Sequence, residues 1–86
     1  ETITGTLEQI YDISSGDIIF KLQDKPTEYY INRGKQQGLF TDELRADLLN
    51  TEVKIEYADH WTPLDPKGRH KHITGIKANN GDIYRQ

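Results

Sequence analysis

The chain has 86 residues, 34% of them hydrophobic and 29% charged, and carries a formal net charge of -3. A chain of this length buries only about 60 to 65% of the surface that its unfolded form exposes, so residues 1–86 should form a single domain around one small core. Residues 1–59 hold 12 acidic and 6 basic side chains, and this acidic part would repel the phosphates of a long duplex. Composition therefore argues against a general binder of double-stranded nucleic acid.

Period-two alternation predicts three strands in the first part of the chain. Residues 3–13 form the first, with a bend or bulge expected at Gly5. One of its faces would carry Ile3, Gly5, Leu7, Gln9, Tyr11 and Ile13. A second strand over 18–23 would alternate Ile18, Phe20 and Leu22 with Ile19, Lys21 and Gln23. A third, over 28–32, must send one of Tyr29 and Tyr30 inward, so only the other can contact a ligand.

The period then changes to that of a helix beginning at Thr41, which can act as its N-cap. Asp42 and Glu43 suit the positive end of the helix dipole, and Asn50 is a plausible end. The apolar stripe of this helix would consist of Leu44, Leu48 and Leu49. Further strands are predicted over 53–57 and from near 72 through 76. An Asn-Gly hairpin turn over 79–82 would lead to a short closing strand over 83–85.

Three strands, a helix and two strands with a small tail is the element order of the oligonucleotide/oligosaccharide-binding (OB) fold. We therefore predict a mainly β domain with one helix, built as a five-stranded OB-fold-like barrel. An SH3-like barrel is the main alternative, although it usually lacks a helix of this length at that position.

Two segments resemble small, uncharacterised bacterial domains found on membrane-attached proteins. They are Tyr57-Ala58-Asp59-His60-Trp61-Thr62-Pro63-Leu64-Asp65-Pro66 and Tyr29-Tyr30-Ile31-Asn32-Arg33-Gly34. The resemblance extends over most of the chain and implies a bacterial source and a cell-envelope or membrane-attached location. That family has no assigned activity to carry over. Because the chain lacks methionine, we also expect it to be a piece excised or processed from a longer protein. It has no cysteine either, so the sequence does not indicate whether its compartment is oxidising or reducing.

The segment 60–72 contains the chain's only tryptophan, all three histidines and two of the three prolines. We therefore expect the 58–72 loop to be the main interaction surface. Trp61 is either a stacking platform for a base or sugar or, as we favour, an apolar anchor for a thin core. Lys67, Arg69 and Lys71 form a basic row that suits an anionic partner.

Tyr30 and Lys21 complete the candidate ligand-binding set, because they lie on the second and third strands, where the OB fold usually binds ligands.

A metal site made by His60, His70, His72 and Asp59 is the alternative use of the same segment, since His70 and His72 would share a strand face. The neighbouring cations and the lack of evident supporting ligands argue against it, and we predict no metal or cofactor. Nucleophilic catalysis has little support, because the chain has no cysteine and its only serines, Ser14 and Ser15, lie in a turn.

We therefore expect a non-enzymatic accessory or binding domain of a larger, envelope-associated bacterial protein, with a protein or a small anionic ligand as its partner. A metal-dependent hydrolase or nuclease-like enzyme and a purely structural spacer are the alternatives. No apolar run is long enough to span a bilayer, so the domain itself is not expected to cross a membrane.

Overall fold

The structure is a computed structural model that describes residues 1–58, 70–78 and 81–85. Its elements, in chain order, are β1 (Thr2–Asp12), β2 (Ile18–Leu22), β3 (Glu28–Ile31), the 3₁₀ helix η1 (Lys35–Gln37), α1 (Thr41–Leu48), β4 (Glu52–Ala58), β5 (His70–Ala78) and β6 (Gly81–Arg85).

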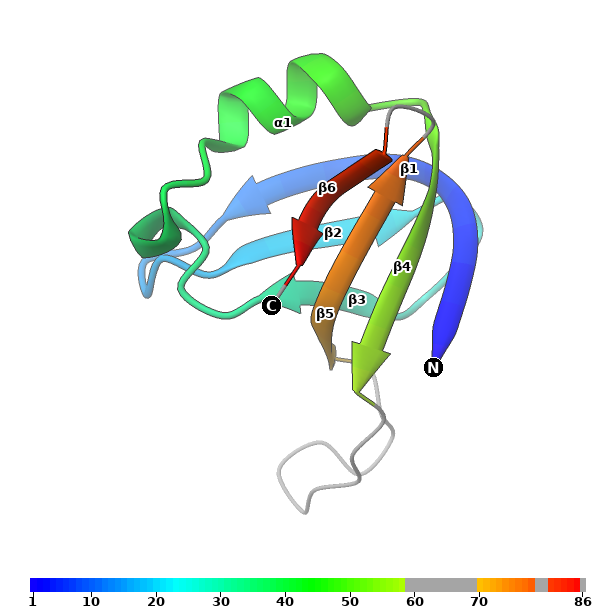
Figure 1. The fold of residues 1–86 in the computed structure, drawn as a ribbon, viewed down its shortest axis with the longest axis horizontal. Coiled ribbons are helices and arrows are strands. Elements are labelled where there is room, and N and C mark those ends of the chain that lie inside the picture. Colours follow the sequence, from blue (N-terminus) through cyan, green and yellow to red (C-terminus); the bar gives the residue numbers. More distant parts are fainter. Residues whose placement is uncertain (59–69, 79–80, 86) are drawn as a thin grey trace.

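Five of these strands close into a barrel. β1 pairs antiparallel with β2 and with β4, β2 pairs with β3, β4 pairs with β5, and a parallel β3–β5 pairing completes the ring. α1 lies between β3 and β4 in the chain and packs against β1 across one end of the barrel (Figure 1). The predicted mainly β, five-stranded, OB-fold-like barrel with one α-helix is confirmed for the part of the chain that the structure describes.

β6 extends the sheet beside β5 as an antiparallel hairpin, with Ala78 opposite Gly81. This pairing confirms the predicted hairpin, but the closing strand begins at Gly81 and not at 83; residues 79–80 lie outside the described residues.

The core fills the inside of the barrel and the space beneath α1. Its buried residues are Leu7, Ile10, Ile18, Phe20, Leu22, Tyr29, Ile31, Leu48, Val53, Ile55, Ile73, Ile76 and Tyr84. The predicted inward positions of β2 are therefore confirmed, and of the two adjacent tyrosines it is Tyr29 that points inward, with 3% of its surface exposed. Tyr29 contacts Tyr57 with ring centroids 5.4 Å apart.

The prediction of uninterrupted alternation along the first strand was wrong beyond Leu7. The register between β1 and β2 shifts between Leu7 and Gln9, which marks a β-bulge. As a result Ile10, not Tyr11, enters the core and is 2% exposed. Gly5, where we expected the irregularity, lies in regular register with Val53.

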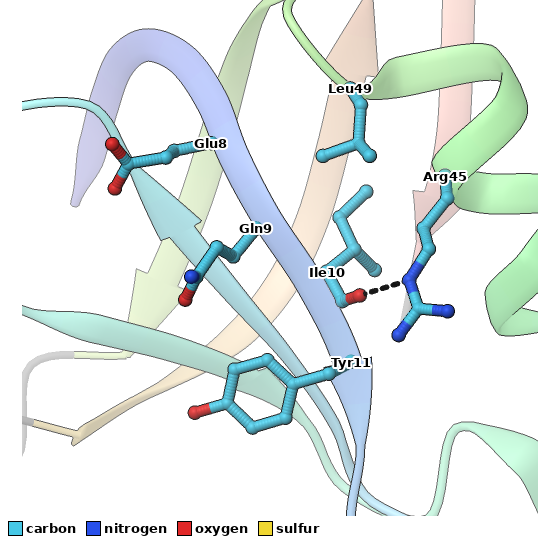
Figure 2. A pocket seen from close by; sticks show the side chains of 6 residues that line it. All are labelled: Glu8, Gln9, Ile10, Tyr11, Arg45 and Leu49. Carbon is cyan, nitrogen blue, oxygen red and sulfur yellow. Dashed lines mark hydrogen bonds between the residues drawn. The ribbon is translucent and has the colours of Figure 1, made fainter.

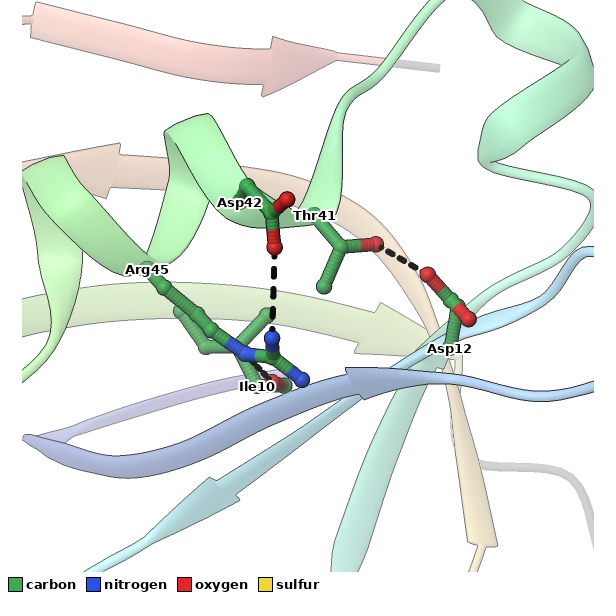
Figure 3. Close-up of polar contacts among 5 residues, drawn as sticks. All are labelled: Ile10, Asp12, Thr41, Asp42 and Arg45. Atoms are coloured by element: carbon green, nitrogen blue, oxygen red, sulfur yellow. Dashed lines mark hydrogen bonds and ion pairs between the residues drawn. The ribbon is translucent and has the colours of Figure 1, made fainter.

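The prediction that Thr41 caps α1 was also wrong. Thr41 is the first residue of the helix and Phe40 is the N-cap, without a side-chain cap hydrogen bond. The Thr41 hydroxyl donates to Asp12 Oδ2 at 2.8 Å (Figure 3), whereas a capping hydroxyl would accept from a backbone N–H of the first turn. The apolar stripe is confirmed, because Leu48 is buried and Leu44 and Leu49 pack against the core. Asn50 ends the helical segment in a left-handed conformation, with φ of 65°.

The 58–72 loop was predicted too long at both ends. Ala58 is the last residue of β4, and residues 70–72 already belong to β5. None of the helices in the described ranges combines the length and the apolarity that a membrane crossing requires.

Candidate ligand-binding surface

Four strands present two parallel rows of side chains on the outside of the barrel. The first row runs across β1, β2, β3 and β5 and consists of Tyr11, Ile19, Tyr30 and His72. The second row lies one step along the same strands and consists of Gln9, Lys21, Glu28 and His70. Their chain neighbours Ile10, Phe20 and Tyr29 are buried in the core, so both rows face outward. We call these eight residues the outer face.

The aromatic row of the outer face is packed. The rings of Tyr30 and His72 stack with centroids 5.4 Å apart and an interplanar angle of 19°. Ile19 is only 6% exposed, although it does not belong to the core cluster. Because Tyr11 and Tyr30 are its cross-strand neighbours, their rings are placed to cover it. The result is a stiff, mostly apolar strip whose rings do not need to be ordered by a ligand.

A carboxylate occupies the centre of the second row. Glu28 accepts a hydrogen bond from the Tyr11 hydroxyl through Oε2 at 2.8 Å, and its Oε1 lies 3.1 Å from His70 Nε2. The hydrogen bond to Glu28 is the main reason that the pKa of Tyr11 is raised, with burial and the negative charge of Glu28 acting in the same direction. Tyr11 is therefore fixed as a neutral donor, and Glu28 is fixed between two strands.

The structure brings together some of the candidates chosen from the sequence. Tyr30 and Lys21 lie on the outer face, and His70 and His72 share a strand face as predicted. Lys71 does not join them. It lies opposite Tyr29, on the other side of β5, where its positive charge opposes the rise in the pKa of Tyr29 that burial causes.

The other candidates lie outside the described residues. Trp61, Lys67 and Arg69, and with them His60 and Asp59 of the alternative metal set, belong to the segment 59–69 that joins Ala58 to His70. Ala58 pairs with His72 of the aromatic row, and His70 is a member of the second row. Predictions for the joining segment therefore stay predictions, although its two attachment points are at the outer face.

The described residues offer little for metal binding. His72 stacks on Tyr30 and His70 contacts Glu28. Among the residues that the structure describes, no group of three or more His, Cys, Asp or Glu side chains is arranged to hold a metal ion.

Four members of the outer face were missed from the sequence: Gln9, Tyr11, Ile19 and Glu28. Tyr11 was assigned to the wrong side of its strand because the bulge was not foreseen at Leu7 and Gln9. Glu28 had a usable signal, since an acidic residue next to two tyrosines in a strand needs polar partners from neighbouring strands.

Comparison of the chain with protein-family models, with curated proteins and with solved structures finds no match.

Proposed function

We propose that this chain is a non-enzymatic binding domain of a larger protein and that it holds its ligand against the outer face. The observation that carries the proposal is the packed aromatic row. In it Tyr30 stacks on His72 and, with Tyr11, flanks Ile19, which is 6% exposed and yet outside the core cluster. Partly exposed flat rings in a fixed arrangement, as here, bind other flat or apolar surfaces at low entropic cost.

The charges of the outer face favour some ligands over others. Glu28 lies at its centre, and the whole chain carries a net charge of -3, so a polyanion laid across the rows would be repelled. An isolated anionic group has a better place near Lys21, the lysine of the outer face. A ligand with apolar faces and hydrogen-bonding edges fits the rows themselves.

The setting of the parent protein is the second part of the proposal. Its support is the resemblance of the segments 29–34 and 57–66 to bacterial domains on membrane-attached proteins, which implies a cell-envelope location. Fractionation of the source cells with an antibody against this domain tests that location. Recovery of the parent protein in the cytosolic fraction alone would contradict it.

The binding function is tested by amide chemical-shift mapping of the 86-residue chain. The probes are a panel of uncharged hexasaccharides, a single-stranded oligothymidylate and a mixed-sequence decapeptide. We expect at least one probe to shift the amides of β2, β3 and the first residues of β5. We also expect Tyr30→Ala to remove that response while Phe40→Ala, at a side chain that is 64% exposed, keeps it. No shift on the outer face with any probe, or full binding by Tyr30→Ala, would overturn the proposal.

A further inference from the structure

A shallow pocket of about 290 Å³ lies between β1 and α1, beside the outer face. It is lined by Glu8, Gln9, Ile10, Tyr11, Arg45 and Leu49 (Figure 2). Its volume is just below the range of about 300 to 1,000 Å³ that is common for small-molecule sites. The pocket therefore has room for a unit about the size of one ring.

The pocket exists because β1 changes partners. Its first half pairs with β4 as far as Thr6, and from Leu7 onward it pairs with β2. The bulge between Leu7 and Gln9 lies at this change. Beyond the bulge, the edge of β1 that no longer pairs with β4 faces α1. A backbone carbonyl on this edge has no strand partner and needs another hydrogen-bond donor.

Arg45 of α1 supplies that partner. Its Nε donates to the carbonyl oxygen of Ile10 at 2.6 Å, and its Nη1 lies 3.3 Å from Asp42 Oδ1 (Figures 2 and 3). The Asp42 side chain is 96% exposed, so this ion pair is strongly screened. Within the described ranges Nη2 has no hydrogen-bond partner. The guanidinium is thus held in place by one nitrogen and still has N–H groups to donate.

The pocket and the outer face form one continuous surface. Gln9 and Tyr11 line the pocket and are also the β1 members of the two rows. The Tyr11 hydroxyl donates to Glu28 in the centre of the outer face. A ligand on the aromatic row can therefore continue past Tyr11 into the pocket.

The lining of the pocket combines complementary hydrogen-bonding groups without an excess of charge. Arg45 donates, Glu8 accepts and Gln9 does both, while Tyr11 and Leu49 provide an aromatic and an aliphatic surface. In Figure 2 the Glu8 carboxylate and the Arg45 guanidinium lie at opposite sides of the pocket. Hydroxyl groups around a ring with an apolar face satisfy all these groups at once, whereas a phosphate would meet Glu8 and Glu28 as like charges.

We propose that the ligand is an uncharged oligosaccharide of two or more rings, with one ring on the Tyr30 and His72 stack and the next in the β1–α1 pocket. This inference rests on the proposed function, because it names the ligand class for the same surface. In it, Arg45 and Glu8 determine which ring is accepted at the second position.

The test is isothermal titration of the 86-residue chain with uncharged saccharides of glucose, N-acetylglucosamine, mannose and galactose, each as monosaccharide and as hexasaccharide. We expect at least one hexasaccharide to bind more tightly than its monosaccharide. Arg45→Gln and Glu8→Ala should each reduce that gain roughly tenfold, which is the effect of losing one good hydrogen bond to a charged group. Glu43→Ala is the control, because this exposed residue of α1 does not line the pocket.

Glu8→Ala keeps the experiment decisive if Arg45→Gln does not fold, since the Glu8 side chain is exposed and makes no hydrogen bond or ion pair among the described residues. If the hexasaccharide binds on the outer face and neither variant changes its affinity, the pocket is not a subsite and only the proposed function stands. If oligothymidylate or the decapeptide binds in place of the saccharides, the ligand class is wrong and the surface is right. If no probe binds the outer face, both proposals fail.

Discussion

Replacing Tyr30 by alanine should destabilise the domain more than its position on the surface of the barrel suggests. The substitution removes the ring that stacks on His72 with centroids 5.4 Å apart, and an aromatic pair of this kind contributes about 0.5 to 1.5 kcal/mol. It also uncovers Ile19, which is 6% exposed in the folded chain. If roughly 40 Å² of Ile19 becomes accessible, the loss is about 1 kcal/mol at 25 cal/mol per Å². We therefore expect the free energy of unfolding to fall by about 2 kcal/mol.

Urea unfolding followed by far-ultraviolet circular dichroism measures this loss. The midpoint should move to lower urea with little change in slope, and the melting temperature should fall by about 10 °C, since 1 kcal/mol corresponds to about 4 to 8 °C in a domain of this size. Phe40→Ala is the matched control, because Phe40 is 64% exposed and surface substitutions usually stay within about 0.5 kcal/mol. Equal stability of the two variants would refute the packed aromatic row.

Three further outcomes are expected. A Cβ at Gly34 would lie 2.7 Å from Ile18 Cδ1, so Gly34→Ala should cost about 1 to 3 kcal/mol. In urea unfolding, adding Ile18→Val to Gly34→Ala should recover part of that loss of stability. Adding Ile18→Val to Gly38→Ala should recover nothing, because an alanine at position 38 is strained by the φ of +88° and its Cβ would have nothing within 4 Å. The pKa of Tyr11 is raised above its ordinary value of 10.0. The stability that this shift contributes is therefore complete below about pH 10 and is lost as the pH rises through the folded-state pKa. Between about pH 9 and pH 11 the free energy of unfolding should fall less for Tyr11→Phe than for the wild type. EDTA should leave the melting temperature unchanged, and a drop of several degrees that zinc restores would favour the metal-site alternative.

The barrel could be predicted because its strands and helix carry their own local patterns. Alternation identified the inward side chains of β2, and the leucines of α1 marked the change of period. The asparagines and glycine at 79–81 identified the hairpin between β5 and β6. Each of these signals depends on residues close together in the sequence, where period and turn chemistry are informative.

These local patterns could not predict contacts between segments that are distant in the sequence. Thr41 looks like a helix cap, and only the fold shows that its hydroxyl donates a hydrogen bond to Asp12, 29 positions earlier. The parallel pairing of β3 with β5 places Tyr30 beside His72, and neither strand contains a signal for the other. The candidate residues of the segment 59–69 were chosen for their chemistry, so their role depends on experiments with Trp61, Lys67 and Arg69.

The bulge in β1 explains why Tyr11, which joins the outer face to the pocket, was assigned to the wrong side of its strand. Between Leu7 and Asp12 the sequence supports two phases of alternation, because Ile10 and Tyr11 are both plausible core residues. Closure of the barrel decides between them, since β1 must leave β4 and join β2 within a few residues. One inserted residue sends Ile10 inward and turns Tyr11 outward to Glu28. The same change of partners exposes the edge where Arg45 binds the Ile10 carbonyl, so one irregularity of the strand produces both the outer face and the pocket beside it.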